Sequence, residues 1–282
     1  MGCFRHSPVG QLLLVWIRPR LLFWMAANAV VMTGAQCLFR WLPAIPHYLG
    51  FNPGIVLLPL AAIFWGPAGV WAAVAASVAG DWACGLWGPL TPWRAAGVFF
   101  AALSAQQLWD FTLLSGACGP AHLPRWGQTF RFLIAAWPGA LIAATWCALG
   151  SELNRLYPFP YYFSLLAAHH LLFITVLGVA FYRVIARELI PWAGDWRELS
   201  KAGECEALVG PVRCSAILLG ALGAPVAGVL VAATVYHMRL FEPFVLGTRC
   251  GPQIPWAVLP FLALLALALL VPCRAGVRQQ KG

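Results

Sequence analysis

The feature that most constrains the fold is a series of long stretches without charged residues. Only 10% of the 282 residues are charged, whereas 61% are hydrophobic. A soluble domain carries about 25% charged residues, so this chain has too few charges to cover a globule in water. Each uncharged stretch approaches the roughly 20 residues that a membrane-spanning helix needs. Alternating strands typical of a β-barrel are not visible. The sequence therefore predicts an all-α, polytopic membrane helix bundle.

We predict about eight transmembrane helices. The second is short, contains Pro59, and is joined to the third through Gly66 and Pro67. Proline and glycine are tolerated in membrane helices where neighbouring helices satisfy the backbone. The predicted spans are 21–39, 54–66, 68–87, 94–115, 132–150, 160–184, 214–236 and 255–273.

Basic residues are distributed unevenly between the two sets of connecting segments. One set holds thirteen and the other five, so the positive-inside rule places the first set in the cytoplasm, with both termini inside. We expect a multi-pass protein of the cytoplasmic membrane. Because the charges are dispersed between apolar stretches, we expect no nucleic-acid partner. The first set is Arg5, Arg18, Arg20, Arg125, Arg131, Arg183, Arg187, Arg197, Lys201, Arg213, Arg274, Arg278 and Lys281, and the second is Arg40, Arg94, Arg155, Arg239 and Arg249.

The predicted organisation has four parts. They are a cytoplasmic N-terminal segment (1–20), a six-helix membrane core (21–187), a cytoplasmic linker (188–213), and two extra transmembrane helices with a short basic tail (214–282).

Small residues recur every four positions in two of these spans. Ala68, Ala72, Ala76 and Gly80 form one stripe, and the stripe beside it ends at Asp81. Small residues at this spacing let helix backbones approach closely, so we expect the third span to be central. The seventh span repeats the pattern with Ala216, Gly220, Ala224 and Gly228.

Asp81 is a carboxylate inside an apolar stretch, about 9 Å from the end of its predicted helix. A carboxylate there costs at least about 2.5 kcal/mol, so it usually faces a bundle interior or a wet cavity. We predict that it faces a hydrated pocket in the outer half of the bundle. A structural hydrogen bond at the outer interface is the alternative. The predicted ligand-binding residues are Asp81, Trp82, Trp87, Asn28, Gln106, Gln107, His169 and His170.

Two simpler interpretations of these side chains stay open. The polar groups could make unrelated interhelical hydrogen bonds, each worth about 0.6 kcal/mol. The tryptophans could be interface anchors. Neighbouring helical residues point about 100° apart, so at most one of the two histidines can face a given cavity squarely.

Signatures of catalysis are absent from the sequence. There is no HExxH, GxSxG, P-loop or Rossmann glycine pattern, so we predict no catalytic residues, no cofactor and no enzyme activity. The nine cysteines show no CxxC and no metal-like Cys/His spacing, which indicates neither a metal site nor a disulfide framework.

Residues 20–187 resemble the substrate-binding S components of energy-coupling-factor vitamin transporters and related sensor-like membrane domains. The motifs are Gly66–Pro67, Gly80–Asp81, and a proline-containing loop from Gly88–Pro89 through Pro92. The stretch "LYPFPYYFSLLAAHHLLFITVLGVAFYRVI" is similar to the family's last span. The resemblance implies a six-helix bundle with an outward-facing pocket for a vitamin-like molecule. It also implies docking onto a transmembrane coupling protein driven by ABC-type ATPases. Two further spans follow where that family normally stops.

Three functions are compatible with these features. The first is a membrane subunit that binds a small vitamin-like micronutrient for uptake, without its own ATPase. The second is a sensor or interaction module that acts through a signalling partner. The third is a membrane-embedded enzyme that modifies lipids, with His169, His170 and Asp81 as acid/base groups.

Overall fold

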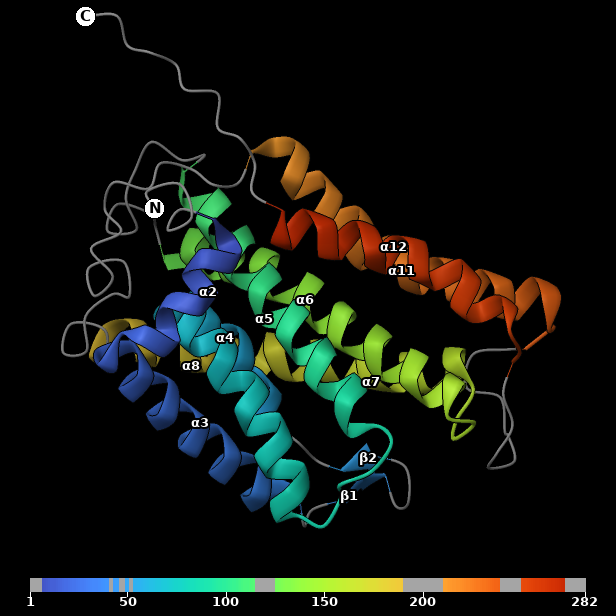
Figure 1. Ribbon diagram of the computed structural model, residues 1–282, viewed down its shortest axis with the longest axis horizontal. Helices are drawn as coiled ribbons and strands as arrows, with labels where there is room; N and C mark the ends of the chain where they lie inside the picture. The colour runs from blue at the N-terminus through green and yellow to red at the C-terminus, as the bar shows by residue number, and fades with distance from the viewer. Residues whose placement is uncertain are drawn as a thin grey trace, which may run out of the picture.

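A computed structural model describes residues 7–40, 43–45, 49–50, 53–114, 125–189, 210–238 and 250–271. Its helices form one bundle, in which elements that follow each other in the chain usually pack side by side (Figure 1). Most of the linker predicted at 188–213, and the basic residues at 5, 197, 201, 239, 249, 274, 278 and 281, lie outside the described residues.

The described elements are almost all helical. Two short strands, β1 and β2, pair antiparallel between α3 and α4. The π-helical segments η3 and η4 continue α7 and α8 as one rod. The helices are α2 (Pro8–Ile17), α3 (Pro19–Arg40), α4 (Leu57–Ala83), α5 (Thr91–Leu114), α6 (Arg125–Leu153), α7 (Phe159–Phe173), α8 (Val179–Val184), α11 (Pro211–Val235) and α12 (Gln253–Leu270). The other elements are β1 (Pro43–Ile45), β2 (Leu49–Gly50), the 3₁₀ turn η1 (Pro53–Val56), η3 (Ile174–Gly178) and η4 (Ile185–Leu189).

Six helical stretches among the described residues are long and apolar enough to cross a membrane. These findings support a multi-pass membrane protein. The helix α5, with 24 residues, is comparably long and packs between α4 and α6. The stretches are Pro19–Leu38, Gly54–Ala83, Trp126–Leu153, Phe159–Glu188, Pro211–Val235 and Gln253–Leu270.

The predicted spans 54–66 and 68–87 form one broken element. Gly66 has a positive φ of 55° and a ψ of −132°, a backbone conformation that glycine adopts readily. At this break the chain reverses, so that Gly69 lies against the backbone of Ala61, leaving no room for a Cβ. The part before the break, Leu57–Trp65, has nine residues and is about 14 Å long at 1.5 Å per residue. It is a half-length helix, which differs from the predicted full span.

The two halves of α4 run in opposite directions along α3. Leu57 lies beside Met32 in a shared pocket, whereas Trp65 lies beside Trp24, with ring centroids 5.9 Å apart. After the break, α4 turns back and ends beside the last turn of α3.

The bundle has two ends, which we name by a residue at each. At the Asp81 end, α3 and α4 finish and α5 and α7 begin, with Cys37 and Cys84 in contact. At the Arg213 end, α11 begins and α12 finishes, and Arg213 donates a hydrogen bond of 2.7 Å to the carbonyl of Leu269. The helix α2 packs against both α4 and α12, so the first and last described helices meet at the Arg213 end.

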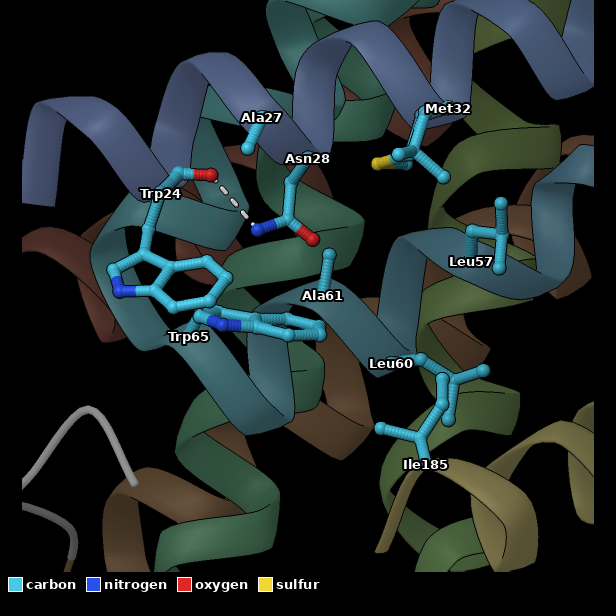
Figure 2. A pocket seen from close by; sticks show the side chains of 10 residues that line it. Trp24, Ala27, Asn28, Met32, Leu57, Leu60, Ala61, Trp65 and Ile185 are labelled. Atoms are coloured by element: carbon cyan, nitrogen blue, oxygen red, sulfur yellow. Dashed lines mark hydrogen bonds between the residues drawn. The ribbon is translucent and has the colours of Figure 1, made fainter. Parts of the chain in front are cut away.

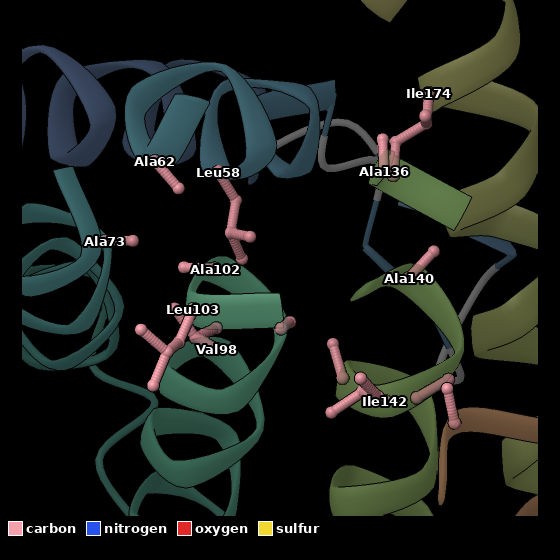
Figure 3. Packing of buried hydrophobic residues seen from close by; sticks show 14 of the residues in the cluster. Leu58, Ala62, Ala73, Val98, Ala102, Leu103, Ala136, Ala140, Ile142 and Ile174 are labelled. Atoms are coloured by element: carbon pink, nitrogen blue, oxygen red, sulfur yellow. The ribbon is translucent and has the colours of Figure 1, made fainter. Parts of the chain in front are cut away.

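Small residues make the close contacts between helices, as predicted. Ala68, Ala72 and Ala76 are fully buried, and Gly80 lies against the side chain of Gln36. Figure 3 shows apolar side chains from α4, α5, α6 and η3 turned toward one another. The predicted central position of the third span is therefore confirmed, because α4 packs on both α3 and α5 and most residues from Pro67 to Asp81 are buried.

The two C-terminal helices form a hairpin that joins the same bundle. Within α11, Gly220 approaches the backbone of Phe261 and Gly228 approaches the ring of Phe159. The hairpin packs along α5, α6 and α7 (orange and red in Figure 1). The stripe of small residues in the seventh span is thus used for packing.

Candidate functional site

Asp81 lies in the last turn of α4 and is fully buried. Its carboxylate forms an ion pair with Arg94 and accepts a hydrogen bond of 2.9 Å from the Thr91 hydroxyl. Both partners belong to the first turn of α5, across a tight connection in which Gly85 has a φ of 67°. A protein partner therefore neutralises the Asp81 charge. The carboxylate does not need a hydrated chamber for that purpose.

Helix dipoles explain why these two charges need each other. A carboxylate in the last turn of a helix and a guanidinium in the first turn each face a partial charge of their own sign. Asp81 and Arg94 occupy these two unfavourable positions on consecutive helices. Their ion pair offsets both penalties and the cost of burying the Asp81 charge.

The same arginine links the pair to two further helices. The guanidinium of Arg94 interacts electrostatically with the Cys147 thiol on α6 and the Tyr162 hydroxyl on α7. The ring of Tyr162 stacks on Tyr157 with centroids 5.1 Å apart. We call Asp81, Thr91, Arg94, Cys147 and Tyr162 the arginine cluster. It joins α4, α5, α6 and α7 at the Asp81 end.

The two histidines are buried further along α7. His170 Nδ1 lies 3.4 Å from the Ala140 carbonyl of α6, and His169 packs its ring against Phe173, with centroids 4.6 Å apart. His170 also interacts electrostatically with Arg94 of the arginine cluster. Trp82 and Trp87, in contrast, are exposed on the perimeter, a position that suits membrane-interface anchors.

The two glutamines lie near the opposite end of the bundle from Asp81. Gln107 donates a hydrogen bond of 3.0 Å to the Leu269 carbonyl, which also accepts from Arg213. The last carbonyls of a helix have no partner within it, so these side chains cap α12. Gln106 is buried beside this site. The predicted outer pocket that would unite Asp81, the glutamines and the histidines is therefore not assembled by the described residues.

Asn28 lies in a different place, in a pocket between α3 and the first half of α4 (Figure 2). The pocket has a volume of about 270 Å³. Its lining is apolar except for the Asn28 amide. The lining residues are Trp24, Ala27, Asn28, Val31, Met32, Leu57, Leu60, Ala61, Trp65 and Ile185.

One polar side chain, that of Asn28, faces this pocket. The amide nitrogen of Asn28 donates to the Trp24 carbonyl at 2.8 Å, and Figure 2 shows its oxygen on the side facing Ala61. The indole N–H of Trp65 is buried, and no hydrogen-bond partner for it occurs in the described part of the chain. This N–H has almost no accessible surface, so it does not face the open part of the pocket.

The half-length helix explains how the pocket arises. The helix Leu57–Trp65 is only nine residues long, and the chain turns back at Gly66. This short helix therefore packs against only part of the length of α3. In the most apolar 18-residue window of Pro19–Leu38 only 11% of the residues are buried, against 78% in that of Gly54–Ala83. The outer wall of the pocket is thus a helix on the periphery of the bundle.

Sequence reasoning missed the role of Glu152. This carboxylate is buried and accepts hydrogen bonds from the backbone N–H groups of Phe159 at 2.8 Å and Gly251 at 2.9 Å. Phe159 is the first residue of α7, and Gly251 lies two residues before the start of α12. A carboxylate at a helix N-terminus is favoured by the helix dipole. Its position seven residues before a proline-flanked helix start was the available signal.

Metal binding has no candidate in the described ranges, where no group of three histidine, cysteine or acidic residues converges. No protein-family model, curated protein or solved structure matches this chain.

Proposed function

We propose that this protein binds a small, largely apolar molecule within the membrane, as the substrate-binding subunit of an uptake system. The observation that carries the proposal is the pocket between α3 and the first half of α4. This site replaces the polar outer pocket expected from the sequence, and of the residues predicted there only Asn28 lines it.

The lining indicates the chemistry of the ligand. Small-molecule sites are mostly apolar and aromatic, with a few polar groups that fix orientation. Here Trp24 and Trp65 provide aromatic surface, and the Asn28 amide provides the polar contact. A volume of about 270 Å³ is slightly below the 300–1,000 Å³ typical of sites for drug-sized ligands. We infer a ligand of one or two rings with a hydrogen-bonding group for the Asn28 amide.

The position of the pocket supports capture of a ligand from the bilayer. The outer wall, α3, is largely exposed in a chain whose long helices suit a membrane. A molecule dissolved in the lipid reaches the pocket by displacing α3 slightly, without crossing the packed core. Such a ligand would partition into the membrane before it binds.

The distribution of basic side chains supports an orientation. Arg18, Arg20, Arg131, Arg183, Arg187 and Arg213 belong to the Arg213 end of the bundle, whereas Arg40, Arg94 and Arg155 lie at the Asp81 end. By the positive-inside rule the Arg213 end faces the cytoplasm. We propose that the Asp81 end faces outward and that a separate coupling protein with ATPases supplies the energy for transport.

Native mass spectrometry of protein extracted in mild detergent tests the binding. We expect a small-molecule adduct at one copy per chain that disappears when the pocket is filled by mutation. Added apolar ring compounds with one hydrogen-bonding group should raise the unfolding temperature. A chain that carries no adduct, and whose unfolding temperature no such compound changes, would exclude this function.

A further inference from the structure

Cys37 and Cys84 lie in contact at the Asp81 end of the bundle. Their sulfur atoms are 3.4 Å apart, and both side chains are half-buried. Cys37 lies in the last turn of α3, and Cys84 is the C-cap residue of α4. Neither takes part in a disulfide bond in this structure. The other cysteines within the described ranges, Cys147, Cys214 and Cys250, are buried.

The packing of α3 on α4 brings these thiols together. Gly80 has no side chain, and the Gln36 side chain occupies the space that a Cβ would need there. This contact, one residue before Cys37 and one helical turn before Cys84, holds the two helix ends close to each other. A disulfide bond length of about 2.05 Å needs an approach of roughly 1.4 Å from the present separation. Rotation of two half-buried side chains at helix ends is sufficient for such a movement.

We propose that Cys37 and Cys84 form a disulfide bond in the oxidised protein, which fastens the outer end of α3 to α4. Disulfides form and persist in oxidising compartments, outside the cytoplasm. The orientation proposed above places the Asp81 end on that side. The sequence spacing of 47 residues gives no sign of this pair, because the intervening chain folds back on itself.

The reaction is a thiol–disulfide exchange with an external disulfide, RSSR. One cysteine loses its proton, and its thiolate attacks RSSR, forming a mixed disulfide and releasing RS⁻. The second cysteine thiolate attacks the protein sulfur of the mixed disulfide and releases the second RS⁻. The two cysteines lose two protons and two electrons in total, and RSSR becomes two RSH.

The bond has a structural consequence for the pocket wall. Its loop, residues 37–84, encloses both strands and the whole of α4, and α3 packs mainly on α4. A covalent tie at one end therefore limits how far α3 moves away from the pocket. This consequence rests on the proposed function, whereas the disulfide itself does not.

Thiol alkylation tests the proposal on the full-length protein. After treatment with oxidised glutathione, we expect two fewer alkylated thiols per chain and a cross-linked peptide pair containing positions 37 and 84. Cys37→Ser should abolish the cross-linked pair and leave at most one blocked thiol, Cys84 as a mixed disulfide with glutathione, whereas Cys214→Ser, at a buried thiol on α11, should leave both changes intact. Full alkylation of both cysteines after oxidation, or cross-links to other cysteines instead, would overturn the proposal.

A second measurement tests the state of the pair in the cell. Thiols trapped by acid quenching of intact cells and then alkylated should show the same cross-linked pair before any added oxidant. Two free thiols in the cell would overturn the proposal. Neither measurement uses a ligand, so failure of the disulfide and failure of the binding function are separate results.

Discussion

Arg94, in the first turn of α5, forms an ion pair with the buried carboxylate of Asp81, in the last turn of α4. Thirteen residues separate them, and the tight turn between the helices brings them to the same end of the bundle. This relationship explains why so apolar a chain keeps an aspartate within a stripe of small residues. The Asp81 charge fixes the connection between two central helices. Its partner Arg94 also interacts electrostatically with Cys147 and Tyr162.

Removal of one partner should destabilise the protein strongly. Breaking a buried ion pair leaves an uncompensated charge, which costs about 3–5 kcal/mol. We expect Asp81→Leu or Arg94→Leu alone to lower the free energy of unfolding by that order. The double variant should lose less than the sum of the two. Denaturant unfolding of the purified protein measures these differences.

The exposed pair Arg187–Glu188, with an N–O distance of 3.1 Å, is the matched control. Both of its side chains are largely exposed, and such pairs contribute little. Arg187→Leu should therefore leave stability nearly unchanged. Equal effects at both pairs, or additive losses in the Asp81/Arg94 double variant, would show that the buried pair is not coupled as described.

Glycine-to-alanine substitutions should have opposite effects in α6 and α3. A Cβ at Gly139 would lie 2.9 Å from the Ala101 carbonyl oxygen of α5, so Gly139→Ala forces the two helices apart. Overpacking of this kind costs about 1–3 kcal/mol. At Gly34 nothing lies within 4 Å, and alanine should instead add up to about 1 kcal/mol through its helix propensity. Thermal unfolding of the two variants, compared with the parent chain, distinguishes the effects by sign. A neutral Gly139→Ala would contradict the close packing of α5 on α6.

Glu152 should be required for the attachment of α7 and α12. Glu152→Ala leaves two buried backbone N–H groups without their acceptor, at about 1–3 kcal/mol for each unsatisfied donor. Glu152→Gln retains one acceptor oxygen, so we expect an intermediate loss. Leu153→Ala changes the exposed neighbour and should have a small effect. Hydrogen exchange of the amides of Phe159 and Gly251 should accelerate in Glu152→Ala; unchanged exchange would contradict this bonding.

The helical bundle was predictable from the sequence because charge depletion and span length are local properties. The central position of the third span followed from its stripes of small residues, and the interruption at Gly66–Pro67 was visible in the residues themselves. The reversal of chain direction at that point was not predictable, because it depends on the backbone conformation of Gly66. The small antiparallel pair β1–β2 was likewise missed.

The candidate site was less predictable, since it depends on partners far apart in the chain. Asp81, His169 and His170 were predicted to share a pocket because they lie at similar depths along their predicted helices. Depth alone does not determine the direction in which a side chain points. Arg94 was treated as a loop residue for orientation, although its position just after the turn made it the natural partner of Asp81. Gln107 has its partner, Leu269, 162 residues away, which no local pattern reveals.

The pocket beside α3 is the central claim, and filling it is the most direct test. Ala27 lines the pocket, whereas its neighbour Ala26 is exposed on α3. Ala27→Phe and Ala26→Phe therefore add the same side chain inside and outside the site. Native mass spectrometry of the two variants, purified alongside the parent chain, should show the bound small molecule lost from Ala27→Phe and retained by Ala26→Phe. An adduct that persists in Ala27→Phe at the parent level would contradict binding in this pocket.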